Sequence, residues 1–193
     1  MMQERIKEIL LSSISVKEAI LSDEAILSRI ELTVEVLVNA FSDHRKVLFC
    51  GNGGSAADAQ HLAAEFSGRF YFDRDPLDAE ALHVNSSYLT AVANDYSYDQ
   101  VYSRLVKAKG AKGDVLVALS TSGNSSNILN AMKVACSLGM KTIGFTGESG
   151  GRMKELSDIL LNVPSKDTPR IQESHITLGH IICEMVEARL FPR

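Results

Sequence analysis

A strand that runs into a Gly/Ser-rich loop and then into a helix occurs twice in this chain. The apolar residues 47–50 lead into Gly51-Asn52-Gly53-Gly54-Ser55, and the apolar residues 115–119 lead into Ser120-Thr121-Ser122-Gly123-Asn124-Ser125. Backbone N–H groups at the start of a helix have no intrahelical acceptor, and the helix dipole places partial positive charge there. Each junction is therefore typical of an α/β fold and can hold an anion such as phosphate without Lys or Arg.

The second loop favours phosphate more strongly, because hydroxyl groups that can donate to phosphate oxygens are concentrated in it. Gly123 and Asn124 tolerate the positive φ angles that turn successive backbone amides toward one anion. The alternative is a tight turn in which one Ser caps the following helix. Four hydroxyls exceed what one cap requires; they belong to Ser120, Thr121, Ser122 and Ser125.

From residue 46 onward, strand and helix patterns alternate along the chain. This alternation predicts a doubly wound, flavodoxin-like parallel sheet of five strands, with ligands bound at the carboxyl ends of the strands, where both loops lie. We expect strands near 47–51, 81–84, 114–119, 141–146 and 159–163, and helices near 55–67, 86–93, 97–109, 126–138 and 150–156, followed by a long helix over 170–190.

Two helices are expected before the sheet, over about 6–20 and 23–41, the second capped within Ser22-Asp23-Glu24. Apolar residues cover more of the second helix than one core can bury, since Leu32, Val36 and Val38 lie off its main apolar face. We interpret residues 1–42 as a helical oligomerisation arm, the alternative being burial within their own domain. Residues 46–193 then form the α/β core of a single domain that spans 1–193.

Composition narrows the class of partner. The chain has 193 residues, 45% hydrophobic content and a formal charge of −4 without a dense basic run, which favours one globular domain and argues against nucleic acid or a membrane as partner. No signal peptide is recognisable at Met1-Met2-Gln3-Glu4-Arg5, and no apolar run approaches the roughly 20 residues that span a bilayer. Cys50, Cys136 and Cys183 are odd in number and lie in apolar contexts. We therefore expect reduced thiols and a cytoplasmic protein.

Two expected helices carry polar side chains suited to chemistry. Asp58, His61, Glu65 and Arg69 recur every three or four residues, so that His61 and Glu65 share one face and can bind a metal or act as acid and base. The alternative is a solvated stripe with an ordinary ion pair four residues apart.

In the last helix, four residues interrupt a run of apolar positions at Ile171, Ile176, Leu178, Ile181 and Ile182; they are Gln172, His175, Gly179 and His180. Glycine inside a helix costs about 1 kcal/mol relative to alanine, so Gly179 predicts that another group approaches closely beside His180. His180 can also be read as a core histidine bonded to the backbone. Elsewhere, Asn94-Asp95 after a short helix is typical of a turn or cap, and can also contact a ligand.

Three other site types are not supported. Gly51-x-Gly53 resembles a dinucleotide loop, but the following strand ends at Asn85 where a ribose-binding acid is expected. Neither Gly loop carries the Lys of a nucleotide-triphosphate loop. No His lies near Ser55 or Ser122 in the sequence to make either a nucleophile.

These motifs together resemble the sugar-isomerase (SIS) domain family and, within it, the isomerases that act on heptose phosphates. The motifs are Gly51-Asn52-Gly53-Gly54-Ser55, His61-x-x-x-Glu65, Asn94-Asp95, Ser120-Thr121-Ser122-Gly123-Asn124-Ser125 and Arg170-Ile171-Gln172-Glu173-x-His175, together with His180. The resemblance implies a homotetramer with sites at subunit interfaces. It also implies the conversion of D-sedoheptulose 7-phosphate into D-glycero-D-manno-heptose 7-phosphate, toward the heptose of lipopolysaccharide or capsule.

The resemblance further implies one zinc ion per subunit, bound at His61, Glu65, Gln172 and His180. The last helix would reach this site from the opposite side or from a neighbouring subunit. Glu65 is the expected base and His180 the expected acid, with direct zinc ligation by Glu65 as an alternating or competing role. The positions implied to contact substrate are Asn52, Gly53, Gly54, Ser55, Glu65, Arg69, Asn94, Asp95, Ser120, Thr121, Ser122, Ser125 and Gln172.

Two alternatives keep the SIS fold without this reaction. One is a non-catalytic tetramer that binds the replication initiator protein, against which the presence of Glu65 and His180 argues. The other is a phosphosugar sensor, which is normally fused to a DNA-binding module; the sequence contains no recognisable helix-turn-helix.

Overall fold

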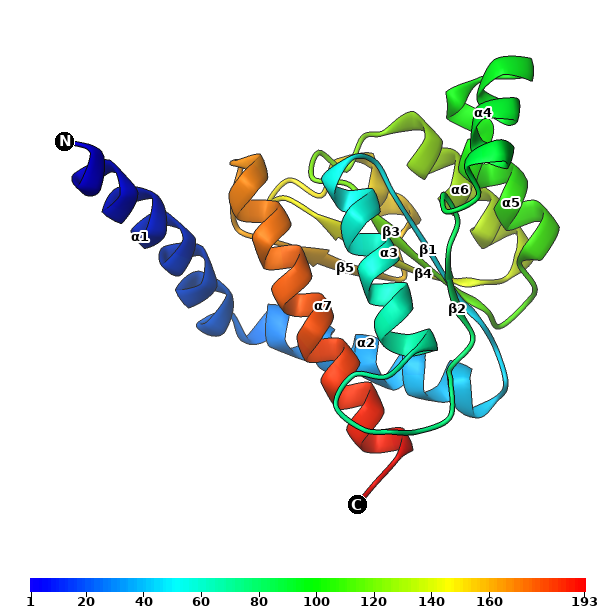
Figure 1. The fold of residues 1–193 in the computed structure, drawn as a ribbon, viewed down its shortest axis with the longest axis horizontal. Helices are drawn as coiled ribbons and strands as arrows, with labels where there is room; N and C mark the ends of the chain where they lie inside the picture. The colour runs from blue at the N-terminus through cyan, green and yellow to red at the C-terminus, as the bar shows by residue number, and fades with distance from the viewer.

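Five parallel strands form the centre of the fold, in the order β2-β1-β3-β4-β5 (Figure 1). They span Val47–Gly51 (β1), Ala79–Ala81 (β2), Val115–Leu119 (β3), Lys141–Thr146 (β4) and Ile159–Asn162 (β5). The computed structural model describes all residues from 1 to 193. This strand order is that of flavodoxin-like folds, so the predicted fold class is confirmed.

Helices cover both faces of the sheet, and alternate strand residues face opposite layers. Val47 and Phe49 of β1 face the layer of α2 (Glu24–Ser42), α3 (Gly54–Ser67) and α7 (Thr168–Leu190). Leu48 and Cys50 face the other layer. That layer contains α4 (Ser86–Asp95), the 3-10 helix η1 (Tyr98–Gln100), α5 (Val101–Lys109), α6 (Ser126–Leu138) and the 3-10 helix η2 (Gly151–Leu156). Both faces are thus buried, which explains the continuous apolar runs of β1 and β3.

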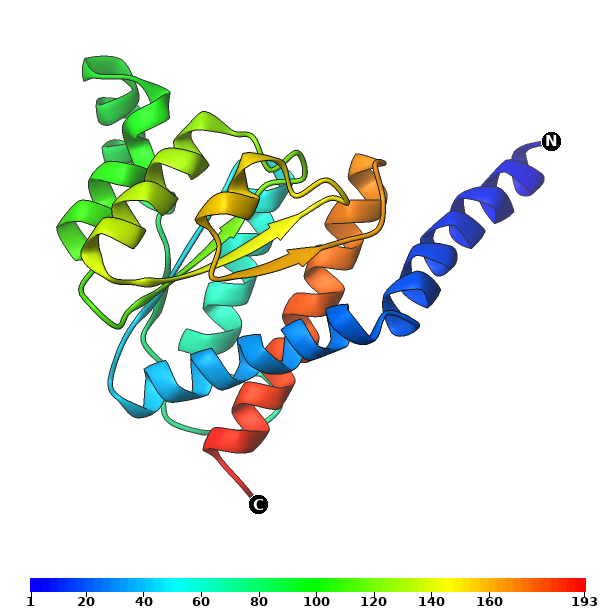
Figure 2. The ribbon, with the colours of Figure 1, turned by 180° about the vertical axis from the view of Figure 1, so that it is seen from behind.

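The first helix, α1 (Met2–Leu21), extends away from the body in both views (Figures 1 and 2). Asp23 caps α2 as expected, its carboxylate accepting from the amides of Ala25 and Ile26. The inner face of α2 belongs to the chain's own core, whereas Leu32 stays exposed. Exposed apolar side chains lie along α1, at Ile6, Ile9, Leu10, Leu11 and Ile14. The apolar surface that one chain leaves uncovered is therefore mainly on α1. None of the helices is both long and apolar enough to cross a bilayer.

Some expected element boundaries were wrong. β2 occupies 79–81 rather than 81–84, because its ladder with β1 pairs Val47 with Ala79, while Leu82 adds one further backbone bond to Phe49. The expected helix over 97–109 is divided into η1 and α5. The expected helix over 150–156 is the 3-10 helix η2, preceded by Gly150 at a φ of 71°.

Two local expectations also need correction. Asn94 and Asp95 lie in the last turn of α4, not in a turn after it. Cys50 and Cys183 are buried as small hydrophobes, but Cys136 is exposed on α6. An apolar sequence neighbourhood marks a helix near the core, and the rotation of the helix then decides which residues face it.

His175 anchors α7 to the end of β4. Its side chain is fully buried, and Nε2 donates to the carbonyl oxygen of Thr146 at 3.1 Å. Burial lowers the pKa of His175 from 6.5 to about 4, partly opposed by this hydrogen bond. The imidazole is therefore neutral in the folded protein at neutral pH, in the role of a core histidine.

Stability should consequently depend on pH through His175. Because its folded pKa is depressed, its contribution is complete above pH 6.5 and is lost as the pH falls from 6.5 to about 4. The loss is up to about 3 kcal/mol by linkage. His175→Gln removes the titration and retains an amide donor for Thr146. Urea unfolding between pH 7 and pH 4 should give a shallower pH dependence for the variant. Parallel curves for the two proteins would contradict this role.

Candidate active site

The two Gly/Ser loops meet at the carboxyl edge of the sheet. β1 and β3 are neighbours, with Gly51 in register with Leu119, so the loops that follow them begin side by side. β1 is also where the chain changes direction across the sheet, with β2 on one side and β3 on the other. Such a switch point is where doubly wound folds bind ligands.

The first loop is a tight turn into α3. A Cβ atom on Gly51 would collide with the carbonyl oxygen of Ser55, and Gly53 has a φ of 56°, so glycine is required at both positions. Gly53 is the N-cap of α3 and provides no side-chain cap. The amides of Ser55 and Ala56 donate to the carbonyl oxygens of Asn52 and Gly53, so among the first amides of the helix that of Gly54 remains for a ligand. Ser55 is buried beneath the turn.

The serine loop gathers hydroxyl groups at the start of α6. Ser120 Oγ lies 3.1 Å from Ser125 Oγ and 3.5 Å from Ser122 Oγ. Ser125 is the N-cap of α6 but makes no side-chain capping bond, contrary to the turn-and-cap interpretation. Gly123 has a φ of 66°, as expected, whereas Asn124 does not have a positive φ. Hydroxyls and helix amides therefore converge in the way a phosphate site requires.

A pair of amides joins the two loops. Asn52 Nδ2 donates to Asn127 Oδ1 at 2.9 Å, and Asn127 Nδ2 donates back to Asn52 Oδ1 at 2.8 Å. Tyr98 Oη donates to Asn52 Oδ1 at 3.3 Å, and Tyr102 Oη donates to the carbonyl of Gly51. Sequence reasoning missed Asn127 because its partner is 75 residues away and no local pattern connects them.

The candidate chemical groups come from α3 and α7 of the same chain. His61 Nε2 lies 2.9 Å from His180 Nε2 and 3.3 Å from Glu65 Oε1. One ligand atom from each of the three residues lies within 4.8 Å of the other two. The two helical faces therefore turn toward each other within one protomer, so the last helix need not come from a neighbouring subunit.

Gly179 explains how α7 comes close enough. A Cβ atom there would lie 2.5 Å from Cδ2 and 2.7 Å from Cδ1 of Leu62, the residue after His61. Gly179 and Leu62 are both buried. The close approach predicted from the sequence is thus the contact of α7 with α3, and it places His180 opposite His61.

The donor set fits a divalent transition metal. Two imidazoles and a carboxylate form a common three-ligand set of catalytic zinc sites, which keep another coordination position for water or substrate. The side chain of His61 is 49% exposed and that of Glu65 is 22% exposed, so a ligand can reach them. On α3 the neighbouring Asp58 has one buried carboxylate oxygen without a partner; burial raises the pKa of Asp58, and His61 opposes this shift.

The remaining candidates lie at three separate places. Gln172 packs on the first loop, where a Cβ atom on Gly54 would lie 2.6 Å from its amide nitrogen. Gln172 precedes His180 by eight residues, about 12 Å along the helix axis. Arg69 is exposed just beyond α3. Asn94 and Asp95 are exposed in the other layer, where Asn94 donates to the Asp95 carboxylate at 2.9 Å.

Comparison with known proteins identifies this arrangement. The SIS domain family model matches residues 14–147, which contain both loops and the His61/Glu65 helix. The phosphoheptose isomerase of Aneurinibacillus thermoaerophilus is 50% identical over 190 residues, covering 98% of this chain and 96% of the relative. That of Clostridium acetobutylicum is 53% identical over 180 residues, covering 93% and 92%.

A solved structure gives the same result. Phosphoheptose isomerase from Neisseria gonorrhoeae superposes with a TM-score of 0.91 at 41% identity, covering 97% of this chain and 100% of that one. Fold and site thus define an SIS-domain sugar-phosphate isomerase. The chain belongs to the phosphoheptose isomerase family, as the resemblance implied.

The contact of α3 with α7 can be tested at Gly179. Gly179→Ala should lower the free energy of unfolding by about 1–3 kcal/mol, because the added methyl group overpacks Leu62. It should also weaken metal binding by moving His180 away from His61. Urea unfolding and competition with a colorimetric zinc chelator measure the two effects.

A substitution at Leu62 distinguishes overpacking from other causes of the lost stability. Leu62→Ala opens a cavity by itself, but in the Gly179→Ala background it removes the clash. The double variant should therefore be more stable than the sum of the single effects predicts. Strictly additive costs would show that Leu62 does not set the distance between the helices.

Proposed function

We propose that this protein converts D-sedoheptulose 7-phosphate into D-glycero-D-manno-heptose 7-phosphate. The observation that carries the proposal is the meeting of His61, Glu65 and His180 on two helices, one of which begins at a phosphate-binding loop. Family membership at 50% identity over almost the whole chain supports the same reaction.

The phosphate is proposed to bind between the two loops. Ser120, Ser122 and Ser125, with Thr121 beside them, donate to its oxygens, and the first amides of α3 and α6 contribute partial positive charge. This end of the substrate does not react, so its binding energy serves to orient the far end.

The spacing along α3 matches a long substrate. His61 follows Gly54 by seven residues, about 10 Å along the helix axis. A seven-carbon chain with a terminal phosphate has eight bonds between C1 and phosphorus, about 10 Å at the rise per bond of an extended chain. The reacting carbons can therefore reach Glu65 and His180 while the phosphate stays at the loops.

Isomerisation is a proton relay between adjacent carbons. Glu65 removes a proton from C1, and His180 donates a proton to the oxygen on C2, which gives an enediol. Glu65 then returns its proton to C2, while His180 recovers a proton from the oxygen on C1. The carbonyl has moved from C2 to C1, and both side chains have regained their starting states.

We propose that His61, Glu65 and His180 hold one zinc ion per chain in the resting protein. When bound, the ion polarises a carbonyl oxygen and offsets negative charge that develops on it. An atom that binds the ion carries no proton, so for both Glu65 and His180 the ligand role and the proton-transfer role would alternate or compete. Gln172 remains a predicted fourth ligand, and its place beside Gly54 also supports contact with substrate.

We further propose a homotetramer whose interfaces include α1. The exposed apolar side chains of α1 have no counterpart to cover them in one chain. Arg69 is exposed just beyond α3, and Asn94 and Asp95 are exposed in the other layer of the fold, which suits residues that complete a site across an interface. The free thiols of Cys50 and Cys183 support a cytoplasmic location, where the product supplies heptose for lipopolysaccharide or capsule.

Removing the acid or the base should abolish turnover without abolishing binding. Glu65→Gln and His180→Ala should each lower kcat by about 10²- to 10⁴-fold, since each removes a proton-transfer group. Binding of sedoheptulose 7-phosphate, measured by calorimetry, should persist because the loops are unchanged. Glu80→Gln alters a carboxylate that pairs with Lys109 and serves as the control with wild-type turnover. An inactive wild-type protein would refute the proposed reaction.

Removing the metal by chelation and removing one of its proposed ligands by substitution should have the same effect on activity. The purified protein should contain about one zinc per chain, lose activity on chelation and regain it on adding zinc back. His61→Ala should bind far less metal, whereas His44→Ala, an exposed histidine outside the cluster, should keep the wild-type content. Elemental analysis measures the metal content, and a turnover assay measures the activity. Full activity in metal-free His61→Ala would exclude a catalytic metal at the cluster.

A further inference from the structure

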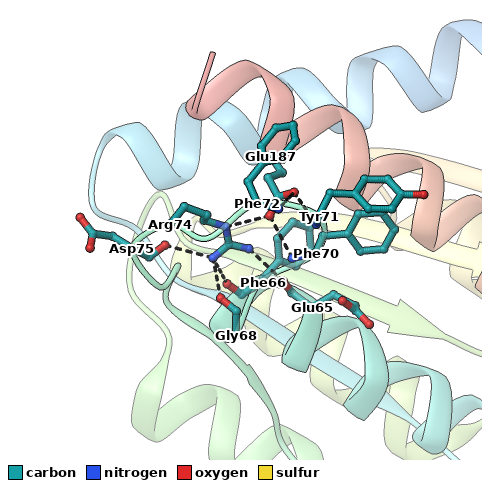
Figure 3. A network of polar contacts seen from close by, with 9 residues as sticks. All are labelled: Glu65, Phe66, Gly68, Phe70, Tyr71, Phe72, Arg74, Asp75 and Glu187. Carbon is teal, nitrogen blue, oxygen red and sulfur yellow. Dashed lines mark hydrogen bonds and ion pairs between the residues drawn. The ribbon is translucent and has the colours of Figure 1, made fainter. Parts of the chain in front are cut away.

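A buried carboxylate organises the loop that follows α3 (Figure 3). Glu187, near the end of α7, is 1% exposed. Its oxygens accept from the amides of Phe70, Tyr71 and Phe72 at 2.9, 2.7 and 3.0 Å, and from Arg74 Nε at 3.1 Å. Burial disfavours its charge, but these donors outweigh burial and hold the pKa of Glu187 below its usual value of 4.5.

The partner of Glu187 fixes the end of α3. Besides its bond to Glu187, the Arg74 guanidinium donates to backbone carbonyls at 2.7 to 3.0 Å. The last carbonyls of a helix have no intrahelical partner, and positive charge is favourable there. Arg74 therefore holds the final turn of α3, which carries Glu65. The carbonyls belong to Glu65, Phe66, Gly68 and Asp75.

The same pair also supports His180. Phe70, whose amide is held by Glu187, places its ring 5.8 Å from the imidazole of His180, centroid to centroid. His180 lies two turns before Glu187 on α7. The ion pair of Arg74 and Glu187 thus restrains the backbone of Glu65 on α3. It also restrains the backbone of Phe70, whose ring packs on His180 of α7.

We propose that Arg74 and Glu187 are positioning residues that set the separation of Glu65 and His180, and so the metal affinity and turnover of the site. Neither touches the substrate in the proposed reaction, on which this inference rests. A buried ion pair is by itself weak evidence for stability, because apolar replacements often cost nothing. What distinguishes this pair is that its bonds go to the two segments that carry the site.

A second buried carboxylate provides a matched control. Asp114 is 1% exposed, pairs with Lys46 at 3.0 Å, and accepts from the amides of Lys46 and Ala111. It lies just before β3, at the amino edge of the sheet, opposite to the loops. Asp114→Asn therefore disturbs a comparable network that has no connection to Glu65 or His180.

The test compares Arg74→Lys, Glu187→Gln and Asp114→Asn as full-length proteins. Zinc affinity is measured by competition with a colorimetric chelator, and kcat and KM are measured at saturating zinc. Arg74→Lys and Glu187→Gln should bind zinc about 10- to 100-fold more weakly, as for residues that orient metal ligands. Their kcat should fall by a similar factor while KM stays within about threefold, because the phosphate loops are intact. Asp114→Asn should lose stability only.

The outcomes separate this inference from the proposed function. Wild-type zinc affinity and kcat in folded Arg74→Lys would overturn the positioning role, whatever reaction the protein performs. Absence of turnover in the wild type would instead overturn the function, while the zinc titrations would still decide the positioning role. If Glu187→Gln does not fold, Arg74→Lys decides alone, since it keeps the positive charge opposite Glu187. Equal loss of zinc affinity in Asp114→Asn would assign the effect to general destabilisation.

Discussion

The parallel contact of α3 with α7 is the constraint on which the site depends. The two helices touch at three levels: Gly54 with Gln172, Leu62 with Gly179, and the loop after α3 with Glu187. At the middle level the absent side chain of Gly179 lets Leu62 fill the space beside α7. Residues on a helix are 100° apart, so a change of register by one residue would turn His180 away from His61. The packing therefore fixes the chemistry.

The sheet supplies the other half of the site. Because β1 and β3 are adjacent at the switch point, both loops open at one edge, and Asn52 and Asn127 join them. α3 belongs to both halves, since its first turn lies at the first loop and its later turns carry His61 and Glu65. In the proposed reaction, this helix would link the end of the substrate that is held to the end that reacts.

Local signals were sufficient to predict much of this arrangement. The two apolar runs with their Gly/Ser loops indicated the sheet and its ligand edge, and Gly179 indicated a close helix contact, since each depends on neighbouring residues. The limits of β2 were wrong because they follow from pairing with β1. The mixed apolar pattern of α2 likewise left open how much of it the chain would bury by itself.

The residues that sequence reasoning missed make long-range contacts. Glu187 binds amides about 115 residues away, and its position on the last helix carries no pattern that predicts this. Arg74 lies in an irregular segment between α3 and β2, where charged residues are ordinarily solvated. Backbone groups of a loop must be satisfied when they are buried, and that requirement becomes visible only when the fold shows which loop is covered.

The distribution of candidates within one chain bears on why such a protein would assemble. His61, Glu65 and His180 meet inside a single protomer, so binding of a metal does not itself require a partner. Asn94 and Asp95 are exposed in the other layer of the fold, and Arg69 is exposed just beyond α3, next to Phe70. If assembly brings these side chains of one copy toward the cluster of another, they can contact a substrate held there. Assembly would then complete the recognition of the sugar, while the catalytic groups stay the property of each chain.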